Sequence, residues 1–187
     1  MFFYRVLVAL VLIFLPLCAH AKMEVMTIDA QKNAIDHNNR GVIYMQDRYY
    51  AAAIKEFQMA VLLDPETQAS SVYYANLANC YMKIGYPALA QDTLQRALKR
   101  HPMNFSLYED LAVVYKRLGI TSQKLKSYGK DSQKNPLSQV MVGLILMEDG
   151  RTEEGLAKLQ EFVYTEPDLI ITNAVKNYIN KRSNLKY

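Results

Sequence analysis

Long stretches of the chain mix charged residues with alanine and leucine, and few helix-breaking residues interrupt them. Only 7 Gly and 6 Pro occur among 187 residues, which favours helices over a series of short strands. The pattern therefore predicts an all-α fold. The predicted helices cover residues 28–46, 49–63, 70–84, 87–100, 104–118, 121–134, 137–148, 152–165 and 168–181.

Four of the prolines divide the chain at regular intervals. Pro65, Pro102, Pro136 and Pro167 lie 37, 34 and 31 residues apart, with an average of 34. A repeat of this length is typical of stacked pairs of helices. Because proline cannot continue a helix interior, each one ends a unit and helps to start the next.

Small and aromatic residues recur at matching places within these intervals. The first unit contains Gly41, Tyr44, Ala53, Phe57 and Ala60, and the second contains Tyr74, Leu77, Ala78, Tyr81, Ala90, Leu94 and Ala97. The third opens with Tyr108, Leu111, Ala112 and Tyr115, and the fourth has Gly143, Leu146, Gly155 and Leu159. This pattern resembles the tetratricopeptide-repeat family over about residues 34–181.

The resemblance implies an α-solenoid of about four antiparallel helix pairs. The expected units are residues 34–67, 71–104, 105–136 and 137–167, after an extension of the first helix over 22–33. Residues 168–187 are expected to form a capping helix and a tail, with Asp168 as the N-cap. Small residues should let the paired helices cross closely, with Tyr44, Tyr81 and Tyr115 filling the space above each crossing.

The third unit departs from the pattern in its second helix. Lys124 stands where a small residue is expected, and Lys126, Lys130 and Lys134 follow it. Residues 96–134 carry nine Lys or Arg against three Asp or Glu, whereas the remainder downstream of residue 21 is close to neutral. We expect this helix to be the least stable element, and to be bent or shifted.

The first 21 residues have the layout of a secretory signal peptide. One positive charge, Arg5, precedes an apolar run over residues 6–17, and Ala19 and Ala21 supply the small residues of a cleavage site. The sequence thus predicts an exported chain, periplasmic or secreted after cleavage near Ala21. Two alternatives stay open: an uncleaved membrane anchor, although the run is short for a spanning helix, and lipidation of Cys18, although Leu17 fits such a signal poorly.

The first helix of each unit is expected to line the concave side of the stack, where a partner polypeptide would bind. The resemblance places eleven residues on this groove: Asn38, Val42, Met45, Asn79, Met82, Lys83, Val113, Lys116, Arg117, Leu144 and Met147. Methionine is common on surfaces that accept varied apolar partners, but packing between neighbouring helices is an equal alternative for Met45, Met82 and Met147.

Charged groups in this groove give two further readings. Lys116 and Arg117 could anchor a carboxylate of a captured segment, or they could belong to a solvated basic face. Some relatives grip a C-terminal carboxylate with Lys and Asn; Asn79 resembles part of that clamp, whereas Val42 and Asp110 depart from it. We therefore expect a protein or peptide partner without assigning the clamp.

Catalysis and other ligands find little support in the sequence. His37 and His101 have no Cys, Asp or Glu at metal-ligand spacing, and no phosphate-binding glycine loop occurs. Cys80, which would be the one cysteine of a processed chain, lies in an apolar stretch and is expected to be a small buried side chain. The prediction is a non-enzymatic scaffold without cofactor, metal, nucleic acid or small-molecule substrate, and with membrane contact only transiently or through an N-terminal anchor.

Overall fold

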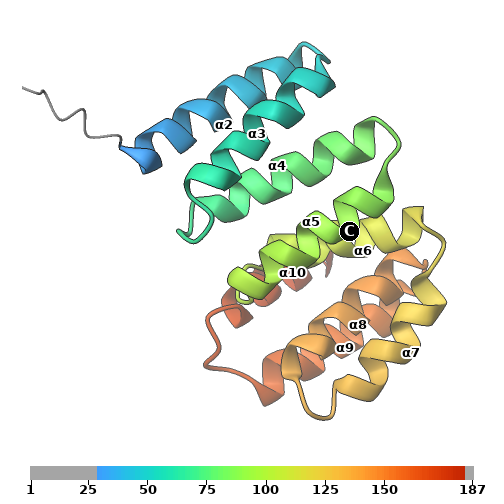
Figure 1. Ribbon diagram of the computed structural model, residues 1–187. Coiled ribbons are helices and arrows are strands. Elements are labelled where there is room, and N and C mark those ends of the chain that lie inside the picture. Colours follow the sequence, from blue (N-terminus) through green and yellow to red (C-terminus); the bar gives the residue numbers. More distant parts are fainter. Residues whose placement is uncertain (1–28, 184–187) are drawn as a thin grey trace, which may run out of the picture.

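The computed structural model of the protein describes residues 29–183, and all regular structure in that range is helical (Figure 1). The predicted signal peptide, residues 22–28 of the extension and residues 184–187 lie outside the described residues. The described helices are α2 (Ala30–Gln46), α3 (Tyr50–Leu63), α4 (Ser70–Lys83), α5 (Pro87–Arg100), α6 (Phe105–Arg117), α7 (Thr121–Asp131), α8 (Pro136–Glu148), α9 (Thr152–Thr165) and α10 (Thr172–Ser183).

The helices form a stack in which α2 packs with α3, α4 with α5 and α8 with α9, which confirms the predicted all-α repeat fold (Figure 1). Successive first helices, α2, α4, α6 and α8, approach one another more closely than successive second helices do. The stack therefore curves with the first helices on its inner side. A shared core of aliphatic and aromatic side chains runs from α4 to α10.

Glycine is required where the helices of a pair cross most closely. A Cβ atom on Gly155 would lie 2.6 Å from the carbonyl oxygen of Gly143, and one on Gly143 would lie 2.7 Å from Leu159 Cγ. In the first pair, a Cβ atom on Gly41 would meet the Phe57 ring at 2.6 Å. These contacts confirm that small residues in register allow the helices to nest.

The tyrosines predicted to fill the crossings join one unit to the unit before it. Gln58 Nε2 on α3 donates to Tyr81 Oη at 3.0 Å, and Gln95 Nε2 on α5 donates to Tyr115 Oη at 3.3 Å. The prediction was wrong for Tyr44, which is exposed. Tyr44 belongs to the first pair, so no second helix of a preceding described pair lies beside it.

Helix α7 is displaced from its expected position, as the lysines in its sequence predicted. It contacts α6 at few points and packs mainly against α8. Thr121 is its only buried residue, and the Lys124 ammonium lies over the Tyr115 ring at 5.0 Å from the centroid. The helix also ends at Asp131, three residues earlier than predicted. That it is the least stable element stays a prediction.

The terminal helix closes the stack but differs from its prediction at its start. It begins at Thr172, and Asp168 lies in the preceding turn instead of capping the helix. Thr172 Oγ1 donates to the carbonyl oxygen of Glu166, which stabilises that turn. Helix α10 then turns back toward α6, where the Tyr178 ring packs edge-on against Phe105 with centroids 5.2 Å apart (Figure 1).

The turn inside each pair has the same backbone geometry in all four units, with one residue in the left-handed region. Gly85, Gly119 and Gly150 occupy this position with φ of 82°, 69° and 86°, whereas the first unit has Arg48 with φ of 64°. The left-handed conformation costs a residue with a Cβ atom about 1–2 kcal/mol. Arg48 therefore places backbone strain in the first turn.

Replacing this arginine should stabilise the protein. We expect Arg48→Gly to raise the free energy of unfolding by about 0.5–1 kcal/mol, the relieved strain less the greater backbone entropy of glycine. The matched variant Gly85→Ala should lower it by about 1 kcal/mol, because a Cβ there meets no atom and only the backbone is strained. Urea unfolding followed by circular dichroism measures both. Equal effects of the same sign would contradict the explanation.

Candidate functional site

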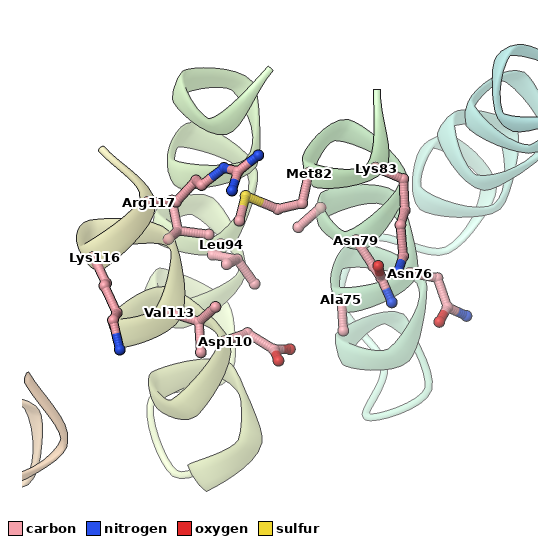
Figure 2. Close-up of a pocket in the computed structure, with 12 residues that line it drawn as sticks. Ala75, Asn76, Asn79, Met82, Lys83, Leu94, Asp110, Val113, Lys116 and Arg117 are labelled. Atoms are coloured by element: carbon pink, nitrogen blue, oxygen red, sulfur yellow. The ribbon is translucent and has the colours of Figure 1, made fainter. Parts of the chain in front are cut away.

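A pocket of about 830 Å³ separates α4 from α6 on the inner side of the stack. Figure 2 shows the two helices as its walls, with Leu94 of α5 between them. The lining residues are Ala75, Asn76, Ala78, Asn79, Met82, Lys83, Leu94, Asp110, Val113, Val114, Lys116 and Arg117.

The pocket stays open where polar and charged side chains of α4 and α6 face each other among apolar ones. These two helices touch at few points, whereas α6 and α8 pack together more extensively. The residues of α8 are mostly apolar and buried, so burial drives that contact. Between α4 and α6, side chains such as Asn79, Lys83 and Asp110 retain contact with solvent. Closing the gap would remove water from these groups without giving them partners.

Six of the eleven predicted groove residues line this pocket. They come from the second and third units: Asn79, Met82, Lys83, Val113, Lys116 and Arg117. Their spacing along α4 and α6 is the helical spacing of three to four residues, so each set forms one stripe along its helix. The structure thus brings together the central part of the predicted site.

The three predicted residues of the first unit lie at the α2–α4 contact instead. Asn38 accepts a hydrogen bond from Asn76 Nδ2 at 2.9 Å. Val42 and Met45 pack against the core cluster of Ala53, Phe57, Leu77 and Cys80. For Met45, the structure therefore favours the packing alternative over an open binding surface.

The prediction was wrong for Leu144 of the fourth unit, which is 2% exposed and belongs to the main core. The same core includes Val175 and Ile179 of α10, and the partly buried Met147 packs against it. Leu144 thus lies inside a core that α8 shares with α10, and Met147 borders Gly155 of α9. The sequence predicts a terminal helix, but it does not indicate how far that helix reaches back over the groove.

Unpaired charges of both signs are the main electrostatic feature of the pocket. Lys116 Nζ lies 3.6 Å from a carboxylate oxygen of Glu148 and points away from α4 (Figure 2). Lys83, Asp110 and Arg117 form no ion pair or hydrogen bond through their side chains within residues 29–183. Asp110 and Arg117 lie on the side of α6 that faces α4, about two turns apart (Figure 2).

Asp110 is the functional candidate that the sequence prediction left out of the site. Its carboxyl is open to the groove, but the surrounding pocket walls displace water, and this desolvation raises its pKa to about 6 from an ordinary value of 3.8. The sequence contains one indication of this, because Asp110 stands where a polar or basic residue of a carboxylate clamp is expected. The raised pKa marks a carboxylate that gains from a cationic partner.

The remaining reactive groups of the described chain are occupied or inaccessible. Cys80 is fully buried, which confirms the prediction of a small buried side chain, and this burial raises the pKa of its thiol to about 11. His37 Nδ1 lies 2.8 Å from a Glu56 carboxylate oxygen that also accepts from Arg40. Residues 29–183 contain no cluster of His, Cys, Asp and Glu suited to a metal ion. The pocket offers apolar surface and charged groups for binding a ligand.

The fold and the pocket define a class, that of helical-repeat proteins with an open inner groove. Comparison with known sequences specifies the family: the tetratricopeptide repeat matches residues 37–67 and 72–102. A tetratricopeptide-repeat protein from Parabacteroides merdae has the same fold, with a TM-score of 0.50 and 16% identity over 82% of this chain and 61% of that one. The chain thus carries tetratricopeptide repeats at these residues, within a fold of stacked helices.

Two further proteins are similar to the chain. Photosystem I assembly protein Ycf3 of Prochlorococcus marinus strain MIT 9303 is 28% identical over 96 residues, which are 51% of this chain and 56% of that protein. The match thus spans little more than half of the relative's length. A crystal structure of MamA has a TM-score of 0.48 and 22% identity, over 74% of this chain and 81% of that one.

The raised pKa of Asp110 predicts that its contribution to the free energy of unfolding depends on pH. Because the pKa of Asp110 is higher in the folded than in the unfolded chain, the folded state binds more protons between about pH 4 and pH 6 and loses stability as the pH rises through that interval. Asp110→Asn removes this loss. We expect the variant to be more stable than the unmodified protein by about 1 kcal/mol near pH 7.5, and we expect the two proteins to be nearly equal in stability near pH 4. The value at pH 7.5 is reduced because the carboxyl is in contact with solvent.

Urea unfolding of both proteins at the two pH values measures the difference. Asp36→Asn, at an exposed carboxylate of α2, is the matched control and should show no such pH-dependent gain. A gain of the same size at both pH values would contradict desolvation of Asp110 as the cause.

Proposed function

We propose that the protein is an adaptor that holds a segment of another polypeptide in the pocket between α4 and α6. Tetratricopeptide-repeat proteins are protein–protein interaction scaffolds, and they are generally non-enzymatic. The observation that carries the proposal is the gap of about 830 Å³ between two helices of one continuous core. A guest segment would fill it and complete the inner surface.

The character of the pocket wall supports a polypeptide as the guest. Met82 and Val113 offer apolar surface, and Asn79 offers donors and an acceptor for a peptide backbone. Val113 is 45% exposed on the pocket wall. Covering such a side chain contributes favourably to binding.

Assembly of a larger complex is the second candidate, and the similarity to a photosystem I assembly protein favours it. An assembly factor of this kind would hold one subunit while others are added. We further propose that the protein acts after export, in an envelope, secretion or pilus-type system, on the signal-like pattern of residues 1–21. An anchored form, which keeps residues 6–17 or is lipidated at Cys18, is the alternative. None of the helices within residues 29–183 combines the length and hydrophobicity needed to cross a bilayer.

Site-specific cross-linking tests the pocket directly. A photo-reactive amino acid at Val113, on the pocket wall, should form adducts with a partner protein in the native cell. The same amino acid at Leu62, which is 72% exposed on α3, should form none or far fewer. Mass spectrometry of the adduct identifies the partner. Adducts from Leu62 but not from Val113 would place the binding surface outside the pocket.

The N-terminus of the purified native protein tests the proposed export. We expect it to begin at Lys22 and to fractionate outside the cytoplasm, because Ala19 and Ala21 present small residues to a signal peptidase. Ala21→Leu should slow this processing, while Ala51→Ser, at an exposed position far from the site, should not. A chain that retains residues 6–17 in a membrane fraction would support the anchored alternative.

A further inference from the structure

The carboxylates of α6 differ in whether the protein supplies them with a cation. Glu109 lies on the side of α6 that faces α10, where Arg182 and Lys181 oppose the rise in the Glu109 pKa that burial and the neighbouring Asp110 cause. On the same side, the Tyr178 ring of α10 packs against Phe105. Helix α10 thus places an aromatic ring and two cations against the inner face of the third unit.

Asp110, the next residue, faces the pocket and has no such cation. Within the described chain, its carboxylate forms neither an ion pair nor a hydrogen bond. Arg117 and Lys83 likewise form no ion pair with a carboxylate of the described chain, whereas Arg100 of α5 pairs with Glu66 at 2.9 Å. The pocket therefore presents both signs of charge without internal compensation.

The separation of these charges sets the spacing of a complementary ligand. Asp110 and Arg117 are seven residues apart on one helix, which corresponds to about 10 Å along the helix axis at 1.5 Å per residue. An extended segment covers this length in about three residues, and a helix covers it in about seven. Val113, midway between them, supplies apolar surface for the residue in the middle.

From this charge complementarity we propose that the guest is a polypeptide segment with a basic side chain placed against Asp110 and a carboxylate placed against Arg117 and Lys83. The inference rests on the proposed function and specifies its partner. The basic side chain takes the role in the open pocket that Arg182 and Lys181 take opposite Glu109. Recognition of both charges differs from capture of a carboxylate alone, because a purely acidic segment would leave Asp110 desolvated and would be repelled by it.

Selection from a library of random peptides of about twelve residues, displayed on phage and bound to the full chain, tests the proposal. We expect the selected peptides to carry both a Lys or Arg and an Asp or Glu, three or about seven positions apart. Selection with Asp110→Asn should lose the preference for the basic residue and keep that for the acidic one, and Arg117→Gln should do the reverse. Asp36→Asn and Lys126→Gln, at exposed positions away from the pocket, should yield the original preferences.

Affinities of single selected peptides give the quantitative check. For a peptide with both charges, Asp110→Asn should weaken binding by about tenfold, as for the loss of one charge-assisted hydrogen bond. A peptide whose basic residue is changed to Glu should bind Asp110→Lys more tightly than it binds the unmodified protein. Circular dichroism confirms that each variant is folded.

The failures of the two proposals are distinguishable. Selected peptides that compete with a Val113 cross-link but lack the charge pair would overturn this inference and leave the proposed function intact. The same result follows if all variants select the same peptides. If the unmodified chain selects no peptide above background, the proposed function and this inference both fail.

Discussion

The close approach of paired helices at small residues is the constraint on which the rest of the structure depends. Where Gly143 and Gly155 meet, the helix backbones come within van der Waals contact, and a single methyl group on either would overlap the other helix. Helices held this closely form rigid pairs, and the pairs can bury their remaining apolar faces only by stacking. The inner surface of the stack follows from this geometry, because first helices then lie side by side.

Stacking is uneven along the chain, and the unevenness produces the pocket. The tyrosines of the second and third units contact the preceding second helix, through Gln58 to Tyr81 and Gln95 to Tyr115, and this fixes the distance between units on the outer side. On the inner side, the polar stripes of α4 and α6 do not gain from contact, so the space between them stays open. The apolar α8, by contrast, packs against α6 and is covered in turn by α10.

Much of this architecture could be predicted from sequence because the signals are local. The period of about 34 residues, the prolines and the small residues at the crossings each constrain neighbouring atoms, and the helix boundaries followed to within a few residues. The central site could be predicted for the same reason, since Asn79, Met82, Val113 and Arg117 follow from helical periodicity once the repeats are aligned.

The failures concern contacts between distant elements. Leu144 was expected in the groove, but its exposure depends on the path of α10, which turns back after Thr172 and cannot be read from the repeat pattern. Tyr44 was expected to be buried, but the partner that buries its equivalents belongs to a preceding unit. Asp110 was passed over because the family pattern asks for a basic or polar residue there, whereas its environment is set jointly by α4, α5 and α6.

Placement of the unpaired charges separates a binding surface from an ordinary solvated face. On the outside of the stack, ion pairs such as Arg151 with Glu154 and Lys158 with Glu161 join residues three apart on exposed helix surfaces. Such exposed pairs add little stability. In the pocket, partial desolvation raises the pKa of Asp110. The cation of Arg117 on the same helix lies two turns away (Figure 2). Asp110 and Arg117 face one pocket without a partner in the described chain, and a ligand that bridges them would supply a partner to both.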